Sequence, residues 1–158
     1  MLSEVQWAPA DNAQDLAFAK ALARRAMMPY YTRHGLLWRD EDFDAGWSWR
    51  ENYRLRGAGA DLGFISLSHD GRALYIRELH LLESARGRGY GGQILQAVHA
   101  DARRRRLPAV RLTVFKDNPA QRLYARQGFV TVGEEGCFWR MECPCPAPSQ
   151  APAAPVRE

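Results

Sequence analysis

The stretch Leu74–Gly92 reads LYIRELHLLESARGRGYGG, and it decides the fold of this chain. Its first part, from Leu74 to Leu82, is a run of apolar and β-branched residues that predicts a strand. The residues Glu83–Ala85 interrupt this strand. An Arg- and Gly-rich loop follows and leads into a helix that is expected to begin at about Tyr90. A strand, a glycine-rich loop and a helix in this order predict a ligand site at the loop.

The loop has the composition of an anion site. The first N–H groups of the helix point into the space around the loop, with the positive end of the helix dipole behind them. Arg86 and Arg88 add two guanidinium groups whose planar forks suit phosphate oxygens. Four glycines without a Cβ let a ligand approach the backbone and tolerate a positive φ: Gly87, Gly89, Gly91 and Gly92. The loop is therefore predicted to bind an anion, with pyrophosphate the favoured ligand.

Two common phosphate-binding motifs can be compared with this loop. The spacing Gly87-x-Gly89-x-x-Gly92 matches the dinucleotide fingerprint, which is a weak match when it stands alone. A Rossmann domain needs several further βα units, and only 66 of the 158 residues follow Gly92. The loop contains no Gly-Lys-Ser/Thr, which excludes a P-loop.

The loop resembles a different nucleotide site. Arg86-x-x-Gly89-x-Gly91, on a strand that ends Leu79-His80-Leu81, resembles the acetyl-CoA loop of the GNAT superfamily of N-acetyltransferases. Asn118-Pro119-Ala120, Leu123-Tyr124 and Gly128-Phe129 resemble the second motif of the same family. The two motifs occur in the family's order, and we regard the pair as a strong indication of membership.

The resemblance implies a fold. It covers roughly residues 60–143, whereas the first 58 residues match only loosely. The expected architecture is α/β: a GNAT fold with a central, mixed and mostly antiparallel sheet of about seven strands and helices on both faces. We expect a single GNAT domain over residues 1–143 and a disordered Pro/Ala-rich tail over residues 144–158.

The helices are predicted from apolar periodicity and from capping residues. A first helix is expected over Asp11–Met28, ended by Pro29, with a loop from Tyr30 to Gly35. Asp40 is a good N-cap for a second helix through about Trp49. In the last helix we expect Asn118 as the cap, Pro119 at the first position and Gly128 after the end.

The strands alternate with these helices. Along the central strand the apolar phase slips, because Leu74 and Ile76 are even-numbered whereas Leu79 and Leu81 are odd-numbered. Side chains of a strand alternate between its faces, so the slip predicts a β-bulge or bend near Arg77–Glu78. The other expected strands are Glu4–Ala8, Glu51–Arg56, Asp61–Ser68, Ala109–Phe115, Phe129–Val132 and Cys137–Glu142.

Composition narrows the possible classes of protein. No apolar run approaches the roughly 20 residues that cross a bilayer, and the N-terminus lacks a signal-peptide pattern. Three cysteines, without the spacing of zinc ligands, indicate a reduced compartment, so we expect a cytoplasmic protein without a metal. The net charge of +4 suggests a nucleic-acid-binding protein. The one basic block, Arg103–Arg106, is however expected at the C-terminal end of a helix, where the helix dipole favours positive charge. We therefore expect neither a nucleic-acid nor a membrane partner.

The resemblance assigns chemical roles to particular residues. Tyr124 matches the tyrosine that protonates the leaving CoA thiolate. Glu78 is the candidate base for the acceptor amine, although it lies one residue after the family's common acid position. His80, His34 and a chain of water molecules are alternatives to Glu78. A strand-edge salt bridge of Glu78 with Arg77 or Arg111 is its purely structural interpretation.

The resemblance also assigns contacts to the cofactor and the acceptor. Main-chain groups of Leu81 and Leu82 should meet the pantetheine amides. Asn118 should contact the pantetheine arm, although it precedes Tyr124 by six residues where the family commonly has seven. The tyrosine pair Tyr30 and Tyr31 is the best candidate for the acceptor pocket. The residues expected at the pyrophosphate are Arg86, Gly87, Arg88, Gly89, Tyr90, Gly91 and Gly92.

The expected function follows from this resemblance. We expect an acetyl-CoA-dependent N-acetyltransferase that acetylates a primary amine of a small molecule by direct attack, with no metal and no covalent enzyme intermediate. One alternative is a protein acetyltransferase that acts on an N-terminus or a lysine. The other is a non-catalytic acyl-CoA-binding sensor module. The sequence leaves open whether the chain forms a homodimer.

Overall fold

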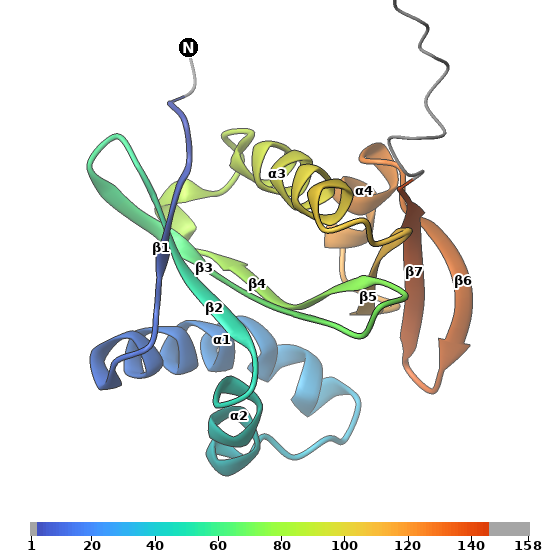
Figure 1. Cartoon of the computed structure of the whole chain (residues 1–158). Helices are drawn as coiled ribbons and strands as arrows, with labels where there is room; N and C mark the ends of the chain where they lie inside the picture. Colours follow the sequence, from blue (N-terminus) through green and yellow to red (C-terminus); the bar gives the residue numbers. More distant parts are fainter. Residues whose placement is uncertain (1–2, 146–158) are drawn as a thin grey trace, which may run out of the picture. The chain divides into compact units, whose positions relative to one another are not determined.

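The computed structural model describes residues 3–145 (Figure 1). Over this range the seven strands form one sheet in the order β1-β2-β3-β4-β5-β7-β6. The seven-stranded, mostly antiparallel sheet confirms the expected fold class. The strands are β1 (Gln6–Pro9), β2 (Glu51–Gly57), β3 (Ala60–His69), β4 (Leu74–Leu81), β5 (Ala109–Phe115), β6 (Val130–Glu135) and β7 (Phe138–Pro144). The helices are α1 (Ala13–Arg33), α2 (Asp40–Trp47), α3 (Tyr90–Arg104) and α4 (Ala120–Arg126), with a short 3₁₀ helix η1 (Glu83–Ala85).

The chain forms two compact units. Among the described residues, the first contains residues 3–68 together with Ile76–Gln93, and the second contains His69–Tyr75 together with residues 94–145. The expectation of a single domain stays a prediction. None of the helices within residues 3–145 is both long and apolar enough to span a bilayer.

The core of the first unit lies between α1, α2 and β3. Apolar side chains of the two helices meet the ring of Phe64, and Phe43 stands edge-on to it with 6.3 Å between ring centroids. Burial of these side chains holds both helices against the strand. The buried members of this cluster are Ala10, Ala19, Leu22, Ala23, Phe43, Trp47 and Phe64.

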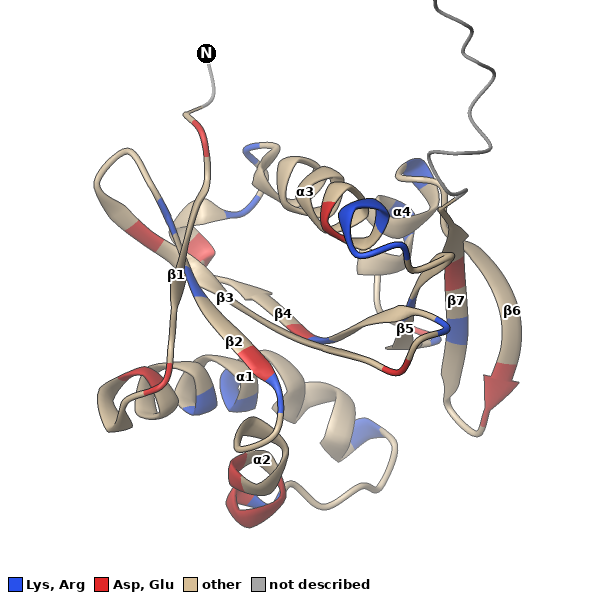
Figure 2. Ribbon diagram, in the orientation of Figure 1, with Lys and Arg blue, Asp and Glu red and all other residues tan. Residues whose placement is uncertain are grey.

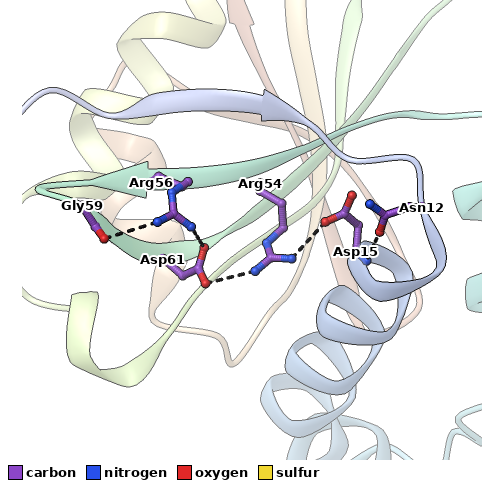
Figure 3. Close-up of polar contacts among 6 residues, drawn as sticks. All are labelled: Asn12, Asp15, Arg54, Arg56, Gly59 and Asp61. Atoms are coloured by element: carbon purple, nitrogen blue, oxygen red, sulfur yellow. Dashed lines mark hydrogen bonds and ion pairs between the residues drawn. The ribbon is translucent and has the colours of Figure 1, made fainter.

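An ion-pair network joins the first turn of α1 to the β2–β3 hairpin (Figure 3). Arg54 donates from Nη1 to Asp15 and from Nη2 to Asp61, each at 3.0 Å. Arg56 donates to the other oxygen of Asp61 at 2.6 Å. The carboxamide of Asn12 accepts the N–H of Asp15 at 2.8 Å, so Asn12 is the N-cap of α1. These contacts fix where α1 begins against the sheet.

The prediction that Pro29 ends the first helix is wrong. Pro29 lies inside α1, which continues to Arg33. A proline in a helix removes one backbone hydrogen bond, but contacts of the last turn offset that loss. The N–H of His34 donates to the carbonyl of Tyr30 at 3.0 Å, and Tyr31 stands edge-on to Trp38. Tyr30 and Tyr31 are therefore helical residues and not loop residues.

The second helix begins differently from the prediction. Arg39 is its N-cap and makes no side-chain capping hydrogen bond, whereas Asp40 is the first helical residue. The Asp40 carboxylate instead accepts the indole N–H of Trp38 at 2.8 Å. The acidic side chains of the first turn gather at one end of α2 (Figure 2). They favour the helix through its dipole, which explains why a side-chain cap is dispensable.

The second unit pairs β5 with β7 and β7 with β6, both antiparallel. Before α4, the carboxamide oxygen of Asn118 accepts the N–H of Ala120 at 2.9 Å, although Pro119 and not Asn118 holds the N-cap position. Gly128, with φ +94°, follows the end of α4 as predicted. Basic residues gather at the C-terminal end of α3, as expected for Arg103–Arg106 (Figure 2).

The first two residues of the predicted tail, Pro144 and Cys145, are ordered parts of the second unit. Pro144 is still part of β7, where it lies opposite Ala109, and Cys145 is buried. The N–H of Cys145 donates to the carbonyl of Pro108 at 2.7 Å, which attaches the end of the strand to the preceding loop. The rest of the predicted tail, residues 146–158, lies outside the described residues.

Candidate active site

The loop before α3 has the backbone of an anion site. Gly87 and Gly89 have φ values of +70° and +88°, a region that favours glycine. The first intrahelical hydrogen bond of α3 runs from the N–H of Gln93 to the carbonyl of Gly89. The three N–H groups before Gln93 therefore lack an intrahelical acceptor. A Cβ on Gly87 would meet no atom of the described chain within 4 Å, so the space beside it is open.

Both arginines of the loop are exposed and anchored to it. Arg86 donates from Nε to the carbonyl of Leu81 at 3.0 Å. Arg88 donates to the carbonyl of Ser84 at 3.4 Å and lies over the ring of Tyr90. Their positive charges therefore stay close to the first turn of α3, where phosphate oxygens would be attracted.

Two of the residues predicted at the cofactor make contacts within the first unit. The side chain of Tyr90 is buried, and its hydroxyl lies 3.2 Å from Ser3 Oγ, so only its backbone faces the loop. Leu82 donates its N–H to the carbonyl of Leu62 at 2.7 Å and accepts the N–H of Ala85 at 2.9 Å. Both main-chain groups of Leu82 already have partners inside the first unit, which no pattern in the sequence indicates.

Glu78 and His80 form a hydrogen-bonded pair in the second half of β4. Residues two apart in a strand share a face, and His80 Nε2 lies 2.8 Å from Glu78 Oε1. An ionised carboxylate only accepts, so Nε2 is the donor of this hydrogen bond when Glu78 is ionised. The ring of His80 also contacts Phe64, with 5.5 Å between centroids. Both residues were predicted as candidate bases, and the structure joins them.

A glycine of β3 makes room for this pair. Gly63 has φ +154°, and a Cβ there would lie 2.0 Å from the carbonyl oxygen of His80. Any other residue at this position would push β3 away from the end of β4. Gly63 therefore sets the place of His80 in the strand.

The salt bridge of Glu78 has a partner that the sequence did not indicate. Arg50 Nη1 lies 3.7 Å from Glu78 Oε2. The two arginines considered for this role bind elsewhere, since Arg77 donates to Ser68 Oγ at 2.8 Å and Arg111 donates to Glu142 at 2.7 Å. Arg50 lies between α2 and β2, far from Glu78 in the sequence, so no local pattern could have identified it.

The contacts of Arg77 and Glu78 support the predicted bulge. Consecutive side chains of a regular strand point to opposite faces. Here Arg77 lies over the ring of Trp49, with 5.6 Å to its centroid, while Glu78 reaches the adjacent Arg50. Two consecutive residues of β4 therefore contact one short segment. The bulge itself stays a prediction.

Tyr31 is close enough to Glu78 for their electrostatics to be coupled. Burial raises the pKa of the Tyr31 phenol, and the charges of Glu78 and Asp42 raise it further. The phenol consequently stays protonated at neutral pH and can donate a hydrogen bond. Tyr30 faces a different neighbour, because Arg33 lies 4.8 Å from the centroid of its ring. Of the two predicted acceptor residues, Tyr31 is the one whose pKa reflects the charge of Glu78.

The predicted acid and the predicted pantetheine contact belong to the second unit. Tyr124 is buried in α4 and stands edge-on to Phe129, with 5.7 Å between ring centroids. Asn118 uses its carboxamide oxygen at the first turn of α4 and retains its Nδ2 as a donor. Within residues 3–145, no group of three or more His, Cys, Asp or Glu side chains is arranged to hold a metal.

Solved structures provide a comparison for the fold. Nourseothricin acetyltransferase is 25% identical with a TM-score of 0.54, and the match covers 61% of this chain and 66% of that one. The ribosomal-protein-S18-alanine N-acetyltransferase of Escherichia coli is 17% identical, with a TM-score of 0.70 over 93% and 97% of the chains. The spermidine N-acetyltransferase of Vibrio cholerae, in complex with CoA and spermine, is 18% identical, with a TM-score of 0.68 over 90% and 96%.

Sequence comparison supplies the family. A search of proteins with curated function gives no match. Residues 16–129, which include both motifs, match the model of the acetyltransferase (GNAT) family. Since this match spans more than half of the chain, the protein belongs to the GNAT family of acetyltransferases.

Proposed function

We propose that this protein is an acetyl-CoA-dependent N-acetyltransferase that acetylates a primary amine of a small molecule by direct attack. The observation that carries the proposal is the Glu78–His80 pair, joined at 2.8 Å. A carboxylate–imidazole pair of this kind can accept the proton that an ammonium group must lose before it attacks.

The loop before α3 fits the pyrophosphate of acetyl-CoA, which would supply the acetyl thioester. The positive φ values of Gly87 and Gly89 open the backbone at the start of α3. The N–H groups of that first turn favour an anion, and no acidic residue lies in the turn to oppose it. Arg86 and Arg88 add positive charge at the same place.

The acceptor must first become neutral. An alkylammonium with a pKa of about 10.4 is neutral only at roughly one part in 10³ at pH 7, which costs about 4–5 kcal/mol. Glu78 would take this proton, directly or through water. His80 holds Oε1 of the carboxylate at 2.8 Å, so the proton would arrive at Oε2.

The thiolate must also be protonated as it leaves. Tyr124 would donate the proton of its hydroxyl to the departing sulfur, because a phenol with a pKa near 10 is protonated at pH 7. The hydroxyl then recovers a proton from solvent. The nitrogen loses two protons in all, one to Glu78 before it attacks and one to solvent once the C–N bond has formed. Tyr124 delivers one proton to the sulfur as the C–S bond breaks, so the reaction releases one proton net.

Two other functions remain as rivals. Structures similar to this chain include, by name, enzymes for a ribosomal protein, for spermidine and for nourseothricin, so the similarity does not select an acceptor. A protein acetyltransferase would use the same Glu78 and Tyr124. A sensor module would bind acetyl-CoA through the loop at Gly87 and Gly89 without turnover.

A turnover assay separates these functions. Purified protein and acetyl-CoA are mixed with a panel of small primary amines and with peptides that offer a free N-terminus or a lysine, and CoA thiol is followed. The proposal predicts slow release without an acceptor and clear acceleration by a small amine. Acceleration by peptides alone would favour the protein acetyltransferase. Binding of acetyl-CoA without acceleration by any acceptor would favour the sensor.

A further inference from the structure

We infer that the amine acceptor carries an oxyanion, a carboxylate in the simplest case, which Arg50 and Arg77 bind beside the Glu78–His80 pair. The inference rests on the proposed function and names the chemical class of its acceptor. It comes from the surroundings of Arg50, a residue between α2 and β2 that no sequence motif singles out.

The guanidinium of Arg50 lacks hydrogen-bond acceptors among the described residues. Its side chain is only 19% exposed, and its Nε is buried without a partner in this part of the chain. The nearest carboxylate oxygen, Glu78 Oε2, is 3.7 Å from Nη1, which is beyond hydrogen-bond distance. Within residues 3–145 the side chain of Arg50 donates no hydrogen bond to another residue. A largely buried guanidinium with five N–H donors is costly unless acceptors are supplied.

Arg54 offers a comparison at the terminal nitrogens, although its Nε, like that of Arg50, is buried without a partner among the described residues. It is buried to a similar degree, with 20% of its side chain exposed. Two of its nitrogens each donate to a carboxylate at 3.0 Å, to Asp15 and to Asp61 (Figure 3). Arg50 has no such pair of carboxylates within residues 3–145, and burial lowers its pKa. The contrast indicates that the acceptors for Arg50 come from a ligand.

A second guanidinium lies close to the first. The ring of Trp49 is 59% exposed and is contacted by both arginines, with 5.3 Å from its centroid to Arg50 and 5.6 Å to Arg77. The positive charge of Arg77 repels the positive charge of Arg50, and this repulsion further lowers the pKa of Arg50. Two guanidinium groups thus lie against one exposed ring, and the first of them also lies 3.7 Å from the carboxylate of Glu78.

Two acidic side chains of α2 are already paired with cations of α1. Asp40 and Asp44 of α2 are paired with the α1 residues Arg24 and Lys20, at 3.8 and 2.8 Å. A polyamine would place a second cation near Arg50 and Arg77 and would be repelled. An amino acid or an aminophosphonate carries both an oxyanion for the two guanidinium groups and an amine for Glu78. Its oxyanion would meet the guanidinium groups and its amine would meet Glu78.

Matched pairs of amines test this inference. Acetylation is measured for glycine, L-phenylalanine, L-methionine and L-lysine, each against its decarboxylated amine, and for aminomethylphosphonate against methylamine. We expect at least one oxyanion-bearing amine to exceed its partner in kcat/KM by roughly tenfold or more, mainly through KM. Equal or faster acetylation of every decarboxylated amine would overturn the inference. A complete lack of amine acetylation would instead contradict the proposed function.

Variants connect the preference to the two arginines. For the best pair of amines, the ratio is the kcat/KM of the oxyanion-bearing amine divided by that of its partner. Arg77→Gln and Arg50→Gln should each bring this ratio close to one, without changing the KM for acetyl-CoA. Arg24→Gln, which removes an exposed arginine of α1, should keep the wild-type ratio. If Arg50→Gln does not fold, Arg50→Lys retains the charge and should still lower the ratio, because a lysine cannot provide the planar fork. A wild-type ratio in both Arg77→Gln and the folded Arg50 variant would overturn the inference.

A binding measurement completes the test without turnover. The best oxyanion-bearing amine from the panel is titrated by calorimetry into wild-type protein and into Arg77→Gln, without acetyl-CoA. We expect binding to the wild type, about tenfold weaker binding to the variant, and weaker wild-type binding as salt is raised. Equal affinity of the two proteins for this amine would contradict an oxyanion site at Arg77.

Discussion

At the scale of single residues, the proposed chemistry depends on how Glu78 is held. One oxygen of its carboxylate accepts from His80 at 2.8 Å, and the other faces Arg50 at 3.7 Å. The sequence could identify Glu78 as an acid near the end of the central strand. It could not identify Arg50, because that contact forms only when the segment between α2 and β2 folds close to β4.

The Glu78→Gln variant should lower kcat/KM for the amine by about 10²–10⁴ at neutral pH, because the proton acceptor is lost. The loss should shrink as pH rises toward the pKa of the amine, since solvent then supplies the neutral nucleophile. Calorimetry should give nearly unchanged affinity for acetyl-CoA. If the variant keeps the wild-type pH–rate profile, Glu78 only supports the structure, and His80 becomes the candidate base.

The Tyr124→Phe variant should lower kcat by about 10²–10⁴ with little effect on the KM for acetyl-CoA, because a general acid is removed while the ring still packs on Phe129. Rapid-quench kinetics should be used so that the chemical step is observed. Tyr53→Phe, which removes a hydroxyl that donates to Glu51, is the control and should keep the wild-type rate. An unchanged chemical step in Tyr124→Phe would assign Tyr124 to packing alone.

At the scale of elements, the loop before α3 joins a local pattern to a ligand site. The strand, the glycines and the start of the helix were all predictable, because each depends on residues that are neighbours in the sequence. The partners of Leu82 were not predictable, because its N–H pairs with Leu62 of another strand. Neighbouring residues were therefore enough to predict the loop, whereas strand pairing determines which main-chain groups near it can still bind a ligand.

The Gly87→Ala variant should weaken acetyl-CoA binding about tenfold or more, because its Cβ would occupy the open space beside the first turn of α3. The matched control is Gly71→Ala, at a glycine with φ +84° and equally open surroundings. Both variants should lose about 1 kcal/mol of stability to an unfavourable φ. Calorimetry and urea unfolding measure the two effects. Equal acetyl-CoA affinity of both variants would remove the cofactor role of Gly87.

The Pro29→Ala variant should stabilise the protein by about 1–3 kcal/mol, because α1 would regain a backbone hydrogen bond and lose the clash of the ring. Pro29 is exposed, so little packing is removed with it. Urea unfolding should show a higher midpoint with an unchanged slope. A lower midpoint would mean that the proline ring supports the last turn of α1, where Tyr30 and Tyr31 lie. The sequence prediction failed here because a proline's local preference was weaker than the helix's tertiary contacts.

At the scale of the whole molecule, the two sequence motifs were sufficient to predict the family. The order of the motifs was the main indication, because Gly87–Gly92 precedes Asn118–Tyr124 as the corresponding motifs do in the family. The acceptor side could not be predicted in the same way. The residues proposed for it, Tyr31, Arg50 and Glu78, come from α1, from the segment between α2 and β2, and from β4, so their proximity depends on the folded structure.

The most direct measurement follows a labelled acetyl group from acetyl-CoA in a single turnover with the best amine of the panel. Mass spectrometry of both the amine and the protein is then performed at successive times. Direct attack predicts that the label appears as an amide on the amine, with one CoA released per product and no label on the protein at any time. Transient label on the protein, or release of CoA without a labelled amine, would contradict an N-acetyltransferase that works by direct attack.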